Sequence, residues 1–290
     1  MAHSGGTIFR KALRRLKPSQ PAEMVKVENR KSESGREQQI PRVVYQTAES
    51  AWVHPSHAKS IAGFRDLNRD LSFELFDGAQ RDSYMSAVWR DHGIFEVYRR
   101  ATLGQMKADI FRYCIVWDRG GYYFDFNKGC GVPLTSLHPA DASGLVSYES
   151  TPEMLFPSVA IAEKLSNPFN LVLQWGFGFV PRHDFLMQVI NRIVEIEPFF
   201  RDKVFPEPKK ALLTMSAPGV FTSVYREFVA SSDDTKITEA GVDFLGHGIF
   251  RLRGSKKTAA HPYYGGLRDQ AIIRSDPEYQ PLPNSEGPGV

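Results

Sequence analysis

The chain has 290 residues, with 36 Lys and Arg against 33 Asp and Glu and a formal net charge of +3. Hydrophobic residues make up 42% and charged residues 24%, so the chain has the composition of a globular protein with a substantial core. A charge balance this close to neutral does not indicate nucleic-acid binding, and we expect no nucleic-acid partner.

Hydropathy and cysteine usage predict a cytoplasmic protein. The sequence has no apolar run long enough to span a bilayer and no apolar core of a secretory signal near its start. Cys114 and Cys130 lack the spacing of a zinc site or a disulfide framework, so we expect two free thiols in a reducing compartment.

Residues 1–38 are polar and charged, and we expect them to form a flexible, basic N-terminal arm. Within it, IFRKALRRLK (8–17) has apolar residues at helical spacing among its basic ones. One interpretation is a short helix on an anionic membrane surface, which would give the protein a peripheral contact with the inner membrane face. The other is a solvated, partly helical tail, because five apolar positions form only a thin stripe.

The first half of the chain predicts two strands followed by helices. IPRVVYQT (40–47) is a short β-branched run, and LSFELF (71–76) alternates apolar and polar residues until Asp77-Gly78. Residues 79–118 contain no proline and predict two short helical segments and then a helix from about residue 103 to residue 118. That helix ends at the glycine pair before YYFDF, the next predicted strand.

The second half continues the alternation of strands and helices. Its predicted strands and amphipathic helices are GLVSY (144–148), WGFGFV (175–180), HDFLMQVINRIVEI (183–196), APGVFTSVYREFV (217–229), VDFLG (242–246) and IFRLR (249–253). This order predicts an α/β fold with one domain over residues 39–275, in which helices cover the sheet, and a flexible tail over 276–290. Ligands of such sheets bind beyond the carboxyl ends of strands, and the end of YYFDF is such a place.

The predicted helix before this strand carries a carboxylate and a guanidinium on one face. Asp109 and Arg112 are three positions apart, and Tyr113 shares their face. Charged groups on a well-packed helix need partners, because burial without them is expensive. Asp109 and Arg112 can form a helix-stabilising ion pair, or they can bind a ligand rich in hydroxyls and phosphates.

The strand end itself has two interpretations. In an extended strand Tyr123, Asp125 and Asn127 would point to the same face. An Asp followed by an Asn at a strand end is typical of a turn, since these side chains bond their own backbone. The alternative is a divalent cation held by oxygen atoms, for which carboxylates and amide carbonyls suit Mg²⁺ or Mn²⁺.

The whole block KADIFRYCIVWDRGGYYFDFNKG (107–129) resembles the motif region of glycosyltransferases with a DXD sugar-binding region. These include yeast-type α-mannosyltransferases, bacterial capsular polysaccharide transferases and, more distantly, clostridial glucosylating toxins. IPRVVYQTAESAW (40–52) is similar to the first strand of that family, with Tyr45 where His is usual.

This resemblance implies a GT-A fold, in which one Rossmann-like domain with a mixed sheet binds a nucleotide sugar. It also implies a metal-dependent hexosyltransferase that uses Mn²⁺ or Mg²⁺ and transfers the sugar with retention. The acceptor would be a glycan or a lipid-linked sugar, as in polysaccharide or glycoconjugate synthesis.

Carried over by position, the resemblance places Asp109 and Arg112 at the donor sugar and phosphate and Tyr123 beside them. Asp125 would be the first DXD carboxylate, which contacts the ribose and the metal. Asn127 stands where the second Asp belongs, so catalysis and metal binding would depend on Asp125 and Asn127.

Further donor and metal contacts are expected from both ends of the domain. Gln46, Thr47 and Trp52 would contact the nucleotide, with Trp52 either stacking on the base or filling the core. His261 would be a late metal ligand, or else a surface histidine before a proline. Asn127 lacks the charge of Asp, which favours a second hypothesis, a non-catalytic nucleotide-sugar or glycan-binding protein on the same fold.

Overall fold

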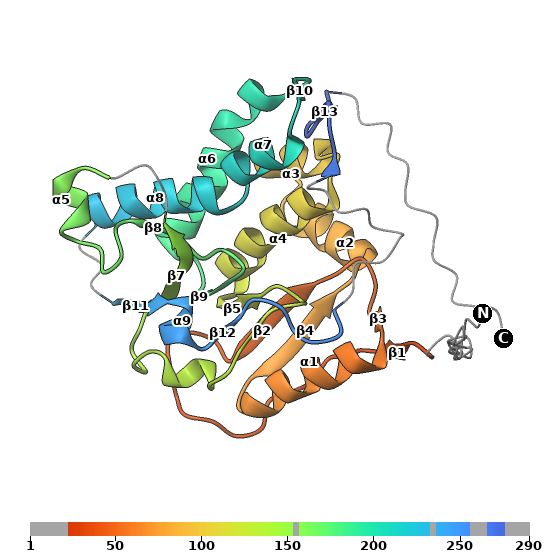
Figure 1. The fold of residues 1–290 in the computed structure, drawn as a ribbon, viewed down its shortest axis with the longest axis vertical. Helices are drawn as coiled ribbons and strands as arrows, with labels where there is room; N and C mark the ends of the chain where they lie inside the picture. Colours follow the sequence, from red (N-terminus) through yellow and green to blue (C-terminus); the bar gives the residue numbers. More distant parts are fainter. Residues whose placement is uncertain (1–22, 153–156, 233–235, 256–265, 276–290) are drawn as a thin grey trace, which may run out of the picture.

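A computed structural model describes residues 23–152, 157–232, 236–255 and 266–275 (Figure 1). It confirms the expected α/β class, with a mixed, mostly parallel sheet between helices. Neighbouring strands follow the order β11-β7-β9-β5-β2-β4, and β8 pairs with β7. The strands are β2 (Val43–Thr47), β4 (Ser72–Phe76), β5 (Gly121–Phe124), β7 (Gly144–Pro152), β8 (Asn170–Val172), β9 (Gly176–Phe179) and β11 (Ile237–Val242).

The sheet brings the carboxyl ends of several strands to one edge. β2 is parallel to both β4 and β5, and β7 is parallel to β11. β9 runs antiparallel between β5 and β7, so β7 points in the same direction as β5. The residues that follow β2, β5 and β7 therefore meet at the same edge, where ligands of such sheets bind.

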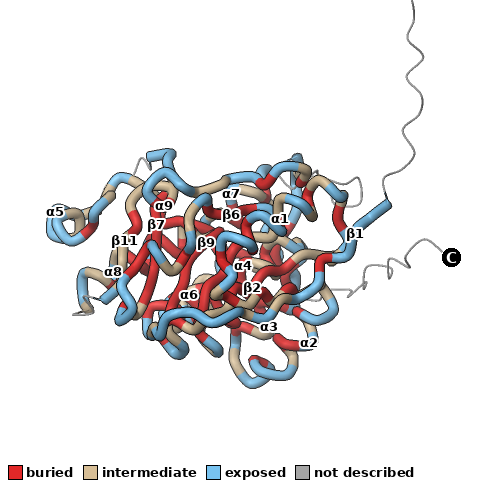
Figure 2. Tube along the Cα trace, turned by 90° about the horizontal axis from the view of Figure 1, so that it is seen from below, coloured by how far each residue is buried: buried red, intermediate tan, exposed pale blue. Residues whose placement is uncertain are grey.

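Most helices cover one face of the sheet, and α1 (Pro55–Leu67) covers the other (Figure 1). Tyr45 and Tyr123 pack into the larger core on the first face, whereas Val44 and Tyr122 pack into a second core that includes Phe64 of α1. Figure 2 shows the central strands buried between these layers. The helices on the first face are α2 (Gly78–Val88), α3 (Gly93–Arg100), α4 (Gly104–Arg119), α6 (Asp184–Phe200), α7 (Pro208–Met215) and α8 (Pro218–Ser231).

Shorter elements complete the described chain. They are the helical turns η1 (Leu134–Ser136), α5 (Val159–Ala162) and α9 (Asp243–Gly246), and the two-residue strands β1 (Val25–Lys26), β3 (Trp52–Val53), β6 (Gly129–Cys130), β10 (Val204–Phe205), β12 (Gly248–Ile249) and β13 (Gln270–Ala271). Both cysteines are buried and free. No helix in the described ranges is long and apolar enough to cross a membrane.

Three predicted strands are wrong or too long, and of IFRLR (249–253) only Ile249 lies in a strand, β12. VDFLG (242–246) is mostly the turn α9, because Phe244 and Leu245 adopt left-handed conformations with φ of 51° and 58°. β5 ends at Phe124, so Asp125 lies in the turn after the strand. In that turn the amide of Lys128 donates to the carbonyl of Asp125 at 2.9 Å, which ends the alternation expected to place Asn127 on the face of Tyr123.

The packed chain also begins earlier than residue 39, where the sequence predicts the domain boundary. β1 pairs with β3, the amide of Val27 donates to the carbonyl of Ala51 at 2.9 Å, and Arg30 forms a bridge with Phe73. Residues 24–38, expected in the flexible arm, therefore run along the domain. Polar side chains make much of this contact: Arg30 donates to the carbonyls of Arg65 and Asn68, and Gln38 donates to the Tyr122 hydroxyl.

Candidate active site

A sharp reversal between α4 and β5 places the predicted helix residues over the end of the strand. Gly120 and Gly121 have φ of 65° and 104°, which favour glycine. A Cβ on Gly120 would approach Pro181 to 2.6 Å, so the turn also needs the missing side chain. The chain doubles back here, and the N-terminal half of α4 therefore lies over the carboxyl end of β5.

Arg112 lies at the centre of the resulting network. Its Nη2 is 2.8 Å from Oδ1 of Asp109 and 3.1 Å from Oδ1 of Asp125. Its guanidinium stacks over the ring of Tyr123, 4.8 Å from the ring centre, and the Tyr123 hydroxyl donates to Asp125 Oδ1 at 3.0 Å. The ion pair expected within the helix is thus part of a larger group that includes the strand end.

The members of this network differ in how far their side chains are exposed to solvent. The side chains of Asp109 and Arg112 are only 5% and 4% exposed, whereas that of Asp125 is 28% exposed. A ligand at the sheet edge can therefore reach Asp125, while the buried Asp109 and Arg112 hold the Asp125 carboxylate in position. Because Arg112 has two carboxylate partners, the network satisfies the charge of this buried guanidinium.

Two residues that the sequence analysis did not assign to the site complete the surroundings of Asp109. Ser216, between α7 and α8, donates to Asp109 Oδ2 at 3.0 Å, and Gln174 Nε2 approaches Oδ1 at 3.4 Å. Burial raises the pKa of Asp109 to about 7, against the lowering effect of Arg112, and Asp125 adds to the rise. Ser216 stands directly before the predicted helix APGVFTSVYREFV (217–229), and Gln174 belongs to no motif.

Asn127 and Lys128 follow Asp125 in opposite environments. Asn127 is exposed, and its carbonyl accepts from the amide of Leu252 at 2.7 Å. Lys128 is buried, with Nζ 3.2 Å from the ring centre of Phe250 and 5.5 Å from that of Trp175. Burial lowers the pKa of Lys128, and the nearby carboxylates of Asp125 and Glu149 raise it.

Gln46, Thr47 and Trp52, which were expected to contact the nucleotide, lie in three different environments. Gln46 is 1% exposed, and both polar atoms of its side chain lack a hydrogen-bond partner among the described residues. Thr47 is buried on the opposite face, where its hydroxyl donates to the carbonyl of Phe76 at 2.9 Å and accepts from Arg81. Trp52 is 52% exposed, so the core interpretation of this residue is wrong.

The residues expected to hold a metal do not form a ligand set in the described chain. The Oδ1 atom of Asp125 already accepts from Arg112 and Tyr123, and Asn127 offers one neutral amide. No group of three His, Cys, Asp or Glu residues suited to a metal exists in the parts of the chain that the structure describes. His261 lies outside the described residues, and Asp125 and Asn127 by themselves do not fit Mn²⁺ or Mg²⁺.

Two histidines of the described chain, His138 and His247, have contacts outside the Asp125 network. His138 is buried, and its Nε2 accepts from the Tyr122 hydroxyl at 2.5 Å while Nδ1 donates to Pro139. His247 is exposed, and its carbonyl accepts from Gly131.

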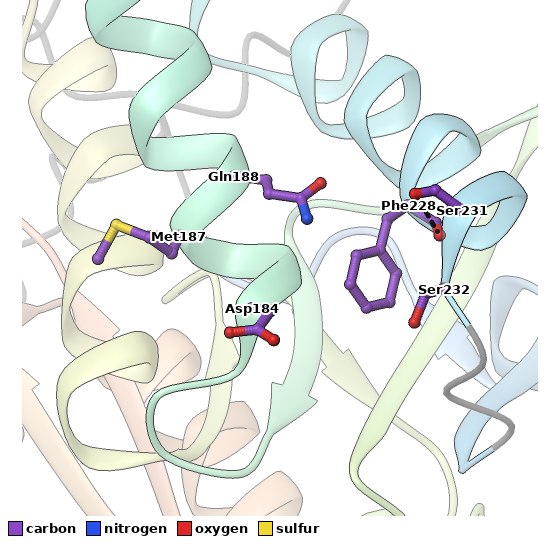
Figure 3. Close-up of a pocket in the computed structure, with 6 residues that line it drawn as sticks. All are labelled: Asp184, Met187, Gln188, Phe228, Ser231 and Ser232. Carbon is purple, nitrogen blue, oxygen red and sulfur yellow. Dashed lines mark hydrogen bonds between the residues drawn. The ribbon is translucent and has the colours of Figure 1, made fainter.

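A surface pocket lies between the start of α6 and the end of α8 (Figure 3). Because β9 is antiparallel to β5, Phe179 pairs with Gly121 at the start of β5, and α6 follows at that opposite edge. The pocket is therefore separate from Asp125. Its lining residues are Asp184, Met187, Gln188, Phe228, Ser231 and Ser232.

The fold and the network define an α/β protein with a partly open carboxylate, held by a buried guanidinium, at the carboxyl edge of its sheet. No protein-family model matches the chain. The initiation-specific α-1,6-mannosyltransferase of Schizosaccharomyces pombe is 20% identical over 199 residues, which are 66% of this chain and 49% of that protein. The chain thus spans about half the length of this relative. A solved PaToxG glycosyltransferase structure aligns with a TM-score of 0.46 and 12% identity, over 66% of this chain and 70% of that one.

The mannosyltransferase similarity supports the glycosyltransferase class, and with it a transferase enzyme, that the sequence motifs predict.

Proposed function

We propose that the chain is a hexosyltransferase that moves a sugar from a nucleotide-sugar donor to a hydroxyl of a glycan or lipid-linked acceptor. The observation that carries the proposal is the Asp109–Arg112–Asp125 network at the carboxyl edge of the sheet. Its only substantially exposed carboxylate, Asp125, would bind donor hydroxyls. Synthesis of a capsular or other polysaccharide, or of a glycoconjugate, is the proposed setting.

The proposed reaction proceeds with retention on one face of the sugar. The bond from the anomeric carbon to the diphosphate oxygen breaks, and its electron pair stays with the diphosphate. The acceptor oxygen then forms its bond to the anomeric carbon from the same face, and its proton passes to the departing phosphate oxygen. Asp125 and the buried groups below it would orient the donor and keep water away from this centre.

The resemblance also implies a bound Mn²⁺ or Mg²⁺, which the steps above do not include. A divalent ion would neutralise the diphosphate leaving group if one were bound. The described residues do not fit such an ion, and the proposed steps involve the donor, the acceptor and this chain's own residues. Asp125, Asn127 and His261 stay as proposed ligands that metal titration would test.

Asn127 favours a second candidate function, a nucleotide-sugar or glycan-binding protein without turnover. Asn127 is exposed at the position where the resemblance calls for a second carboxylate. Calorimetry separates the two functions, because tight nucleotide binding without turnover, with or without metal, would favour the binder.

The direct test is hydrolysis and transfer with a panel of donors that includes GDP-mannose, UDP-glucose and UDP-N-acetylglucosamine, each with Mn²⁺ and with EDTA. We expect turnover of at least one donor and its loss in Asp125→Ala. Asp141→Ala is the matched control, because the Asp141 side chain is 68% exposed and Asp141 precedes the start of β7, at the sheet edge opposite Asp125. Undiminished turnover in Asp125→Ala would remove Asp125 from the site.

Membrane contact through the N-terminal arm is a further part of the proposal. Near its first residues the described chain has an apolar ribbon, in which Met24, Val25 and Trp52 are 44%, 41% and 52% exposed. β1 pairs with β3 to form this ribbon, and β1 begins eight positions after the basic segment 8–17 ends. An anionic inner membrane surface suits both features and would bring a lipid-linked acceptor to the sheet edge.

A further inference from the structure

Lys128 holds a buried ammonium next to the candidate site. The residue is 8% exposed, and it lies three positions after Asp125 in the turn that ends β5. Trp175, which enters β9, lies on one side of the ammonium, and Phe250, which follows β12, lies on another. Two separate elements therefore fix the position of this charge.

Burial of an ammonium is expensive, so its surroundings require an explanation. Aromatic faces stabilise it, since the ring quadrupole attracts a cation. Asp125 and Glu149 also act on it electrostatically, but it forms no ion pair with any carboxylate of the described residues. Unlike Arg112, which is held between Asp109 and Asp125, Lys128 is thus a cation that is not committed to one partner.

Glu149 is a second carboxylate that acts on the Lys128 ammonium. β7 points in the same direction as β5, so Glu149, near the carboxyl end of β7, reaches the same sheet edge as Asp125. Lys128 interacts with both carboxylates.

We propose that the ammonium of Lys128 supplies the positive charge opposite the donor diphosphate, so that sugar transfer does not require a bound divalent cation. This inference rests on the proposed glycosyltransferase function. As the bond to the anomeric carbon breaks, negative charge grows on the departing diphosphate, and a fixed cation in a water-poor site stabilises it. Asn127 in place of a second Asp is then consistent with a site that does not collect ligands for a metal.

The segment after β12 completes this arrangement. The amide of Leu252 donates to the carbonyl of Asn127 at 2.7 Å, which holds the segment against the turn. Phe250 itself is 71% exposed, so one face of its ring covers Lys128 while the other meets solvent. The diphosphate would approach Lys128 along this exposed edge, beside Asp125.

The test uses the full chain and measures two quantities in EDTA and in Mn²⁺, the turnover of the donor panel and the affinity for GDP and UDP by calorimetry. Lys128→Met keeps the aliphatic stem between Trp175 and Phe250 and removes the charge. Lys128→Arg keeps the charge. Lys210→Met is the control, because the Lys210 side chain is 79% exposed on α7. Thermal unfolding of each variant establishes that it is folded.

We expect the wild type to turn over donor and bind nucleoside diphosphate in EDTA. Lys128→Met should lose about 10²-fold or more in turnover, the effect of removing one preorganised electrostatic group, and at least tenfold in diphosphate affinity. Lys128→Arg should recover part of both, and Lys210→Met should match the wild type.

Turnover that occurs only with Mn²⁺ would overturn the inference and leave the glycosyltransferase function standing. The same holds if folded Lys128→Met equals the wild type in EDTA. Absence of both turnover and nucleotide binding in the wild type, with and without Mn²⁺, would instead reject the proposed function and this inference with it.

Discussion

Arg112 of α4 contacts Asp125 beyond β5 through Nη2 and Oδ1, 3.1 Å apart, and the same nitrogen is 2.8 Å from Asp109. One guanidinium thus links a helix to the turn that carries the candidate ligand-binding carboxylate. The link is nearly dry, since the Arg112 side chain is 4% exposed.

Removal of this link should destabilise the fold. Arg112→Met leaves Asp109 and Asp125 without their cation, and we expect a loss of about 3–5 kcal/mol in the free energy of unfolding, measured by urea titration. Arg192→Met is the control: Arg192 pairs with Glu227 at 2.8 Å, but the two side chains are 31% and 51% exposed, so its loss should cost about 1 kcal/mol or less. Equal losses in the two variants would contradict the central role of Arg112.

Asp109 should make stability depend on pH. Its folded pKa is about 7, above the ordinary Asp value of 3.8, so the folded protein keeps a proton that the unfolded chain releases as pH rises from about 4. The free energy of unfolding should therefore fall with rising pH and level off above about pH 7. Between pH 5 and pH 7 this contribution is about 2 kcal/mol.

Urea titrations at pH 5, 6, 7 and 8 measure this slope, and Asp109→Asn should flatten it because the amide does not titrate. Asp141→Asn, on a side chain that is 68% exposed, should keep the wild-type slope. A slope that Asp109→Asn leaves unchanged would assign the pH dependence to other groups.

Substitution of Gln46 should have opposite effects on the stability of the fold and on nucleotide binding. Its buried amide lacks partners among the described residues, so Gln46→Leu should raise the free energy of unfolding by about 1 kcal/mol. If the amide binds the donor, the same change should weaken GDP or UDP binding about tenfold, measured by calorimetry. Gln188→Leu, on an exposed position of α6, is the control, and unchanged affinity in Gln46→Leu would remove Gln46 from the donor site.

Trp52 should act as a stacking surface for the nucleotide base. We expect Trp52→Ala to weaken nucleotide binding by about 1–3 kcal/mol and to leave the unfolding temperature nearly unchanged, because half of the side chain is already exposed. Phe199→Ala, at a 63% exposed position of α6, should change neither quantity. Equal nucleotide affinities in Trp52→Ala and the wild type would show that Trp52 serves another purpose, such as the apolar ribbon.

The basic arm should bind anionic vesicles in a salt-dependent way. We expect the full chain to sediment with phosphatidylserine vesicles at low salt and to be released at high salt. A variant with Gln at Arg10, Lys11, Arg14, Arg15 and Lys17 should bind at least tenfold more weakly, since each basic residue near the surface contributes about 1 kcal/mol. Binding that this variant retains in full would reject electrostatic membrane contact through the arm.

Local sequence determined most of the helices and strands near the candidate site. The proline-free run before Gly120 predicts helices where α2, α3 and α4 lie, and the apolar runs predict β2, β4, β5, β7 and β9. These elements follow from residue periodicity and from the glycine pair, which act over a few positions. Elements with weak periodicity, such as α1, α7 and β11, were not predicted, because contacts with distant segments stabilise them: α7 packs on α6 and α8, and β11 pairs with β7.

The sequence by itself also determined that Asp109 and Arg112 share a helix face and that Asp125 follows a buried strand. Only the tertiary structure decided that one guanidinium binds both carboxylates, that Ser216 and Gln174 support Asp109, and that Lys128 is enclosed by Trp175 and Phe250. Asp125 lies 13 positions from Arg112, and the contacts of Ser216, Gln174, Trp175 and Phe250 join residues 47 to 122 positions apart. Such distances are set by how the sheet and helices pack, which no local pattern of residues encodes.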